Sequence, residues 1–216
     1  MLETKNIKKS YNNLQVLKGI DLVINQGEII SIVGASGAGK STLLHLLGTL
    51  DKADEGEILL NGVDLGKLSD KDLAKFRNEK IGFIFQFHNL MAELTAIENV
   101  CLPAWIAQKD ESQTKERAEK LLEVLNVAHR KDHLPSELSG GEQQRVAVAR
   151  ALINSPSVVF ADEPSGNLDS KNAEELHHLF FDLRNKFNQT FVIVTHNEQL
   201  ANMADRKLEM RDGLII

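Results

Sequence analysis

The residues with the clearest chemical character form a glycine-rich run from Gly34 to Ser41. Its glycines let the backbone curl so that successive N–H groups point at phosphate oxygens, and a helix that starts there adds partial positive charge. Lys40 would reach the β and γ phosphates, and the Ser41 hydroxyl could bind Mg2+. The alternative is a glycine-rich turn. The apolar strand before the run and the apolar helix after it favour a phosphate loop.

A second motif, Val158 to Glu163, is an apolar strand that ends in two carboxylates. Open α/β sheets present catalytic residues at the carboxyl ends of their strands. Asp162 suits the magnesium shell, and Glu163 suits polarising an attacking water. Alone, the pattern also fits a strand followed by an acidic helix cap. Beside a phosphate loop, it favours hydrolysis of a nucleoside triphosphate.

A third motif, Leu138 to Glu142, reads Leu-Ser-Gly-Gly-Glu and opens a helix. A helix start with a serine and two glycines can bind a second phosphate face through its backbone N–H groups. A glycine-rich helix cap explains the same pattern equally well. The residues of this motif alone leave both interpretations open.

The elements around these motifs are typical of an α/β fold, because apolar strands that alternate with helices indicate a parallel sheet covered on both faces. Residues 95–127 carry a helical pattern with one apolar face, which predicts an inserted helical lobe. Asp212-Gly213 predicts a closing hairpin over 208–216. We expect strands at 2–8, 17–24, 28–33, 56–62, 81–85, 157–161 and 190–195, and helices at 40–47, 69–76, 142–153 and 171–185.

Composition limits the class of protein. The 216 residues, 42% hydrophobic and 26% charged, suffice for one domain. The longest apolar stretches fall far short of the roughly 18 residues that span a bilayer, and no signal region follows Met1, so we expect a cytosolic protein. A net charge of −6 argues against coating nucleic acid and against docking on anionic lipid by charge alone. Cys101, the one cysteine, is expected to be a buried apolar residue.

Leu138 to Glu142 resembles the signature of ATP-binding-cassette ATPases, and the other motifs of that family occur in order over nearly the whole chain. The resemblance implies a phosphate-loop NTPase core with a mixed sheet, an N-terminal antiparallel β subdomain and an inserted α-helical subdomain. It implies one nucleotide-binding domain over 1–216, with the α/β core at 1–90 and 156–216 and a helical lobe at 91–155 that carries the signature.

The resemblance also implies residue roles. Tyr11 is similar to the aromatic residue that stacks on adenine, although a core Tyr is the alternative. Gln86 resembles the glutamine that contacts Mg2+ and the water and senses the transporter. Residues 165–169 resemble the loop that crosses the dimer interface, and His196 resembles the histidine that touches the γ-phosphate, although a lone His at a strand end is usually structural.

The full set of implied site residues has three parts. The catalytic residues are Glu163, His196 and Gln86, and the Mg2+ ligands are Ser41, Gln86 and Asp162. The ATP-binding residues are Tyr11, Gly34, Ala35, Ser36, Gly37, Ala38, Gly39, Lys40, Ser41, Thr42, Ser139, Gly140, Gly141, Glu142 and Asp169. The histidines without a motif match, interpreted as structural or surface residues, are His45, His88, His129, His133, His177 and His178.

The implied partners are a second copy of the chain and integral membrane transporter subunits, with no nucleic acid. In the family's head-to-tail dimer, ATP lies between the phosphate loop of one copy and Ser139 to Gly141 of the other. Since this chain contains every element, including Glu163, a homodimer with two competent sites is the simplest prediction.

The segments Phe85–Pro103 and Ala161–Asp169 resemble a branch of the family that serves lipoprotein release, drug or peptide export, and cell-division control, and they are most similar to its lipoprotein-releasing members. Ser165 and Asn197 depart from the usual Thr and Asp. The expected location is peripheral, on the cytoplasmic face of the inner membrane, with coupling helices of the membrane partners in a groove around 86–105. A soluble cassette that acts on ribosomes or DNA would carry tandem cassettes, coiled-coil insertions or zinc elements.

Overall fold

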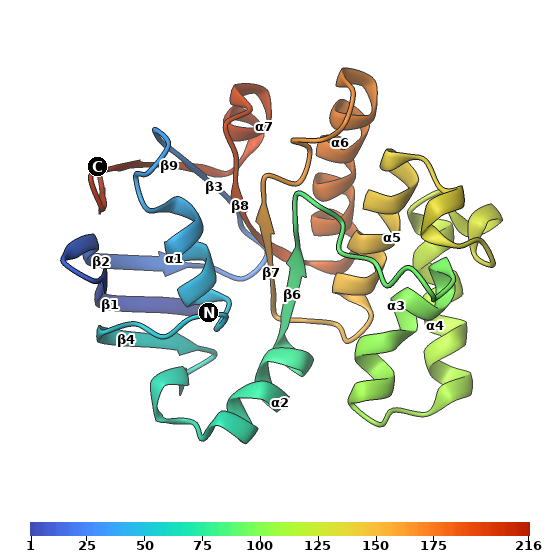
Figure 1. Ribbon diagram of the computed structural model, residues 1–216, viewed down its shortest axis with the longest axis horizontal. Coiled ribbons are helices and arrows are strands. Elements are labelled where there is room, and N and C mark those ends of the chain that lie inside the picture. Colours follow the sequence, from blue (N-terminus) through green and yellow to red (C-terminus); the bar gives the residue numbers. More distant parts are fainter.

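The computed structural model describes all 216 residues and contains two sheets with helices on their faces (Figure 1). A six-stranded sheet has the order β10-β9-β3-β8-β7-β6, and a four-stranded sheet has the order β2-β1-β4-β5. The strands are β1 (Leu2–Tyr11), β2 (Leu14–Ile24), β3 (Ile29–Val33), β4 (Glu55–Leu60), β5 (Val63–Asp64), β6 (Ile81–Ile84), β7 (Val158–Asp162), β8 (Thr190–Val194), β9 (Arg206–Arg211) and β10 (Leu214–Ile215). The helices are α1 (Lys40–Leu47), α2 (Asp70–Lys80), α3 (Ala96–Ile106), α4 (Glu111–Val124), α5 (Gly140–Leu152), α6 (Ser170–Phe187) and α7 (Glu198–Met203).

The central strands β3, β8 and β7 of the larger sheet are buried on both faces. The strands of this sheet are parallel apart from β10, which pairs antiparallel with β9 in the predicted hairpin. Alternate residues of each strand enter different clusters: on β7, Val158 and Phe160 pack with α1 and the smaller sheet, whereas Val159 and Ala161 pack with α3 to α6. Because side chains alternate along a strand, burial of both faces requires the continuous apolar runs seen in the sequence.

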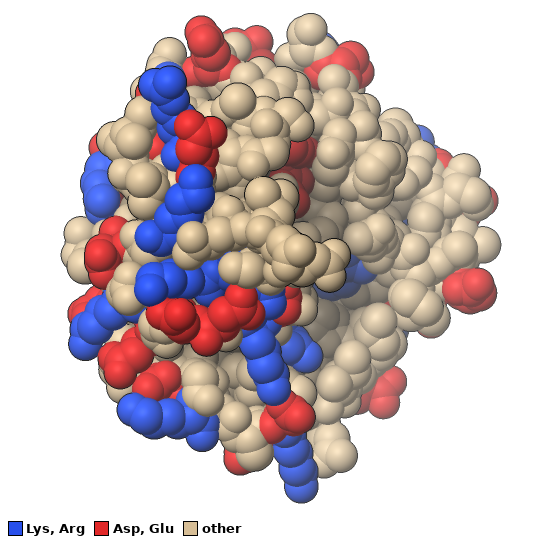
Figure 2. Space-filling view, turned by 60° about the vertical axis from the view of Figure 1, so that its left-hand side comes forward, with Lys and Arg blue, Asp and Glu red and all other residues tan.

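The smaller sheet is antiparallel and covers α1. Its first two strands are joined at Asn12, which has a left-handed φ of 53°, a conformation that asparagine tolerates well. Charges of both signs mix on this side of the molecule (Figure 2), where Lys8 pairs with Glu55 and Lys5 with Glu57 across neighbouring strands. The antiparallel sheet, the mixed sheet and the helical insert confirm the predicted fold class.

The helical lobe forms over the predicted stretch 95–127 and contains two helices there. Helix α3 ends before Ala107, and Asp110 starts α4 by accepting a hydrogen bond from the backbone N–H of Gln113. The predicted apolar face of Ala118, Leu121, Leu122 and Leu125 is buried as expected. Helix α5 begins two residues earlier than predicted, and α7 was not predicted at all.

The structure also describes the one cysteine and the apolar character of the helices. Cys101 is buried, as predicted, and burial raises the pKa of its thiol to about 11. A thiol with so high a pKa stays protonated near neutral pH and is a poor nucleophile. None of the helices combines the length and the apolar character that a membrane span requires.

Candidate nucleotide site

The site is assembled where neighbouring parallel strands end. The phosphate loop, Gly34 to Ser41, follows β3, the two carboxylates close β7, and His196 follows β8. These strands are adjacent in the order β3-β8-β7, so their carboxyl ends bring the three motifs together. The sheet therefore places a phosphate-binding loop beside a pair of acids.

The phosphate loop has the curled backbone that its glycines allow. Gly34, Gly37 and Gly39 have φ values of 147°, 80° and 101°, and a Cβ on Gly34 would lie 2.2 Å from the carbonyl oxygen of Met210. The Lys40 Nζ donates hydrogen bonds to the carbonyl oxygens of Gly34 (2.8 Å) and Ala35 (2.9 Å). The first turn of α1 carries no acidic residue, so its positive end faces the loop without competition.

The two carboxylates lie in different surroundings. The Ser41 hydroxyl donates to Asp162 Oδ1 over 3.2 Å, and burial raises the pKa of the Asp162 carboxyl. Glu163 has a left-handed φ of 46° and accepts from the backbone N–H of His196 over 3.2 Å. The same oxygen, Oε2, lies 2.8 Å from His196 Nδ1. A strained backbone conformation held by such contacts is a frequent feature of catalytic residues.

The oxygen ligands fit Mg2+. The Ser41 hydroxyl and the Asp162 carboxylate are hard donors that already lie side by side. No group of three or more His, Cys, Asp or Glu side chains in the chain could hold a metal by itself. Magnesium is usually bound by one or two protein oxygens together with water and substrate phosphates. The residues present therefore suit a magnesium ion that arrives with a nucleotide.

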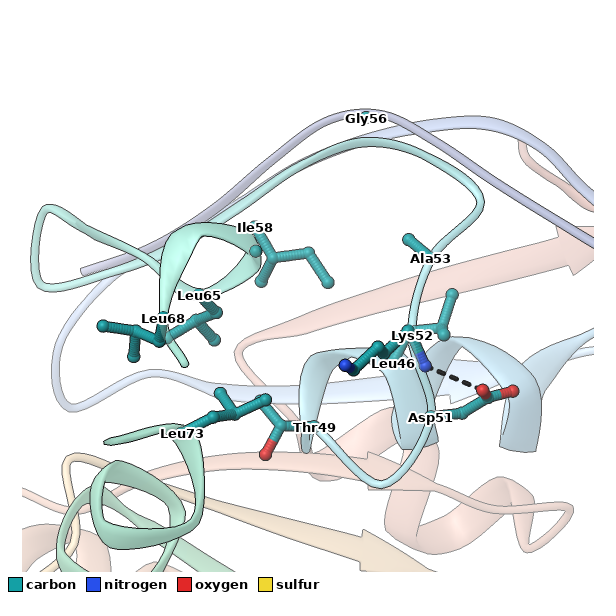
Figure 3. A pocket seen from close by; sticks show the side chains of 11 residues that line it. Leu46, Thr49, Asp51, Lys52, Ala53, Gly56, Ile58, Leu65, Leu68 and Leu73 are labelled. Carbon is teal, nitrogen blue, oxygen red and sulfur yellow. Dashed lines mark hydrogen bonds between the residues drawn. The ribbon is translucent and has the colours of Figure 1, made fainter. Parts of the chain in front are cut away.

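Tyr11 lies at the end of β1, and 45% of its surface is exposed. Its hydroxyl donates to Asp51 Oδ2 over 2.6 Å, and this bond raises the pKa of Tyr11. Lys9 Nζ lies 5.1 Å from the ring centroid. Asp51 also lines a largely apolar cavity of about 170 Å³, together with residues such as Leu46 (Figure 3). The ring is fixed at its hydroxyl end and open to a stacking partner.

The signature motif caps α5. The Ser139 Oγ accepts from the N–H of Glu142, and the Glu142 carboxylate accepts from the N–H of Ser139 over 2.7 Å. The hydrogen bond from the Ser139 N–H is the largest cause that lowers the pKa of the Glu142 carboxyl. The Ser139 side chain and Arg130, whose Nε lies 3.0 Å from the carboxylate, lower it further, to about 2. Ser139 and Gly140 are exposed, whereas Gly141 packs against Asn172 and has no room for a Cβ. The positive end of α5 thus faces solvent.

Gln86 contacts the 165–169 loop. Its Nε2 donates to Asn167 Oδ1 over 3.3 Å, and Asn167 Nδ2 donates to the Gln86 carbonyl over 3.0 Å. Asp169 caps α6 by accepting from the Asn172 N–H over 2.9 Å. Asn167 was not predicted as a site residue, and its place in the 165–169 loop beside the acidic motif is the one signal of it in the sequence.

The predicted site residues fall into two groups within one chain. The phosphate loop, the acids and His196 meet at the sheet edge, together with Gln86 and the 165–169 loop. The signature stands apart, because α5 lies on the opposite side of β7 and β8 from α1 (Figure 1). The two helix ends suited to phosphate therefore do not face each other in a single copy.

Comparison with known proteins agrees with this arrangement. The profile of the ABC transporter family matches residues 17–166, which include the phosphate loop, the signature and the acidic motif. The chain therefore belongs to the ABC transporter family, as an ATP-hydrolysing cassette.

Within the family, the chain is similar over its full length to ATP-binding proteins of lipoprotein-releasing systems. The chain is 60% identical to the lipoprotein-releasing system ATP-binding protein LolD of Cytophaga hutchinsonii over 100% of the chain and 99% of the relative. It is 58% identical to LolD of Bacteroides fragilis over the full length of both proteins. Among solved structures, it resembles the dimeric ATP-binding cassette MJ0796 in a post-hydrolysis state with ADP and phosphate, with a TM-score of 0.90 and 39% identity over 100% of the chain and 96% of that cassette.

Proposed function

We propose that two copies of this chain close head to tail around two ATP molecules, with the phosphate loop of one copy opposite Ser139 to Gly141 of the other. The separation of these two phosphate-binding helix ends within one chain carries this proposal. The similar MJ0796 cassette is described as dimeric. In this arrangement, residues 1–216 act as one nucleotide-binding domain, with 91–155 as the lobe that presents the signature to the other copy.

Each residue has its own role at each site. Lys40 exchanges its hydrogen bonds to the neutral loop carbonyls for hydrogen bonds to the β and γ phosphates. The new bonds are stronger because the acceptor oxygens are charged. Ser41 and Asp162 would hold Mg2+, with Gln86 as a further ligand, and a bound ion would supply positive charge to the phosphates. Glu163, oriented by His196, accepts a proton from the attacking water. Tyr11 stacks on the adenine.

We also propose that the closing motion is delivered to integral membrane subunits through a groove of about 490 Å³ between α2, β6, α3 and α5. Its lining includes Phe85 and Ile106, and the side chains of Phe87 and Ile106 are 69% and 67% exposed. Exposed apolar residues beside a groove are typical of a protein–protein contact. The identity to LolD supports lipoprotein release from the inner membrane as the process driven, with the chain peripheral on the cytoplasmic face.

The test is purification of the tagged chain from its native membranes, with native and Glu163→Gln forms compared. We expect Glu163→Gln to accumulate a dimer in ATP and Mg2+, because ATP is bound but not cleaved, and both forms to bring down membrane subunits of the lipoprotein-releasing type. Copurification of membrane subunits of another type would refute lipoprotein release as the process driven but keep the transport proposal. A purely soluble partner would overturn the transport proposal.

A matched pair of variants tests the groove. Ile106→Glu should abolish copurification of the membrane subunits while it preserves the ATP-trapped dimer. Leu14→Glu, at a side chain that is 68% exposed on the antiparallel sheet, should change neither. Equal copurification of the two variants would count against the groove.

A further inference from the structure

A buried histidine contacts the 165–169 loop. His177 lies on α6 and is 1% exposed, and its Nε2 lies 3.0 Å from the Oγ of Ser165. Ser165 is itself 8% exposed, so water has little access to this pair. A hydrogen bond in such surroundings restricts both groups more than a bond at the surface would. His177 therefore has a contact suited to holding the loop.

The surroundings of His177 select one form of its ring. Nδ1 is buried and has no hydrogen-bond partner. A proton on Nδ1 would leave a buried N–H without an acceptor, whereas a proton on Nε2 can be donated to Ser165. An imidazolium would add a buried charge to the unpaired N–H, and burial accordingly lowers the pKa of His177. The neutral ring with its proton on Nε2 is the form that fits.

Other hydrogen bonds hold the 165–169 loop on either side of Ser165. Before Ser165, the buried Gln144 donates from Nε2 to the carbonyl oxygen of Pro164 over 2.7 Å. After it, Asn167 exchanges hydrogen bonds with Gln86. Within the loop, the Ser165 carbonyl accepts from the N–H of Leu168 over 3.1 Å. Ser165 is thus the point at which the loop is tied to α6.

We propose that His177 is a positioning residue for the ATP-bound dimer: as a neutral donor to Ser165, it fixes the conformation in which the 165–169 loop meets the second copy. This inference rests on the proposed head-to-tail dimer. The side chain of His177 makes its hydrogen bond to Ser165 and none to the phosphate loop or the acids, so its removal acts on dimer closure and turnover and leaves nucleotide binding to a single chain intact.

Closure is measured by light scattering as a function of ATP concentration, with every variant placed in the Glu163→Gln background. His177→Phe keeps a ring but removes the donor, and it should weaken ATP-dependent dimerisation about 3- to 10-fold, the loss expected for one hydrogen bond. Binding of a fluorescent ATP analogue to the single chain should stay unchanged. His177→Gln, which can place an amide N–H near the position of Nε2, should restore most of the loss. His178→Phe, at the exposed neighbour on α6, is the matched control and should behave like the parent.

A double-mutant cycle assigns the effect to the pair. If the bond to Ser165 carries it, Ser165→Ala should cause a similar loss, and adding His177→Phe to Ser165→Ala should cause no further loss. Additive effects, or a His177→Gln chain as weak as His177→Phe, would overturn the proposal. Urea unfolding of each variant checks that the chains compared are folded. If His177→Phe does not fold, the single variants Ser165→Ala and His177→Gln provide the test.

Nitrogen NMR of the ring gives a readout independent of dimerisation. The neutral form with its proton on Nε2 is expected at pH 7, and a proton on Nδ1 or an imidazolium would refute the proposed donor. Failure of the parent Glu163→Gln chain to dimerise in ATP would instead refute the proposed dimer, and the inference would fall with it. Dimerisation of the parent with the other form of the ring would refute the inference alone.

Discussion

Arg150 should hold the loop that carries Gln86. It lies in the last turn of α5, and its Nη1 and Nη2 donate to the carbonyl oxygens of Asn89 (2.6 Å) and His88 (2.8 Å). The two bonds need the planar fork of a guanidinium. Arg150→Lys keeps the charge but provides one compact ammonium, which can replace one bond well and not both. Arg150→Met keeps an apolar stem of similar length and removes both.

The magnitude follows from the number of bonds lost. A hydrogen bond to a charged group contributes about 1.5 to 3 kcal/mol, with the larger values where water is excluded. Arg150 is only half-buried, so we expect Arg150→Lys to lower the free energy of unfolding by about 1.5 kcal/mol and Arg150→Met by about 3 kcal/mol. Urea unfolding at pH 7 measures both values, and steady-state ATP hydrolysis with membrane subunits measures the functional loss.

The matched control is Arg206→Lys. Arg206 Nη1 also donates to a backbone carbonyl, that of Val23, and pairs with Glu28, but its side chain is 42% exposed. Exposed pairs contribute little, so this change should cost about 0.5 kcal/mol or less. If Arg150→Met lost no more stability than Arg206→Lys, the loop would not depend on the guanidinium and the reasoning would be refuted.

Three further predictions concern the nucleotide site. Tyr11→Phe keeps the ring and should change ATP affinity by less than about twofold, whereas Tyr11→Ala should weaken ATP affinity about 5-fold or more because stacking is lost. Titration calorimetry measures both, and equal affinities of the two variants would contradict the role of the ring. Lys40→Met should abolish ATP binding in the same assay while it leaves the urea midpoint nearly unchanged, because the lysine now bonds only to loop carbonyls. The Glu142 pKa of about 2 lies below its ordinary value of 4.5, so the stabilisation from this carboxylate is complete above pH 4.5 and is lost as the pH falls toward 2. Glu142→Ala should therefore cost about 2 kcal/mol in urea at pH 7 and progressively less from pH 4.5 downward, and a constant difference across that range would refute the ion-pair and capping argument.

Much of the fold could be predicted because its signals are local. The strands of the large sheet are continuous apolar runs, and the phosphate loop and the acidic motif each follow one of them, so the sequence placed both motifs at carboxyl ends of parallel strands. The structure adds the strand order that makes these ends neighbours. The hairpin at Asp212-Gly213 was equally visible. Each of these features depends on residues that are neighbours in sequence.

The features that escaped prediction depend on residues far apart in the chain. His177 and Ser165 are 12 residues apart, and Arg150 lies 61 residues from Asn89. In the sequence, His177 is one of two adjacent histidines, and only the packing of α6 shows which of them is buried. The helical pattern over 95–127 did not locate the break between α3 and α4, for a different reason. Helical propensity continues through residues 107–110, and the cap at Asp110 decides where α4 starts.

The contacts of Gln86 and its loop suggest how a membrane subunit can reach the ATP site. Residues 86–89 are tied on one side to α5 through Arg150 and on the other to the 165–169 loop through Asn167. The signature serine, Ser139, caps the start of α5, and the 165–169 loop ends in Asp169, which caps the start of α6. In the proposed dimer, both of these segments face the second copy. A displacement of the Gln86 loop therefore reaches the 165–169 loop through the hydrogen bonds of Asn167, and reaches the signature end of α5 through Arg150 and the length of the helix.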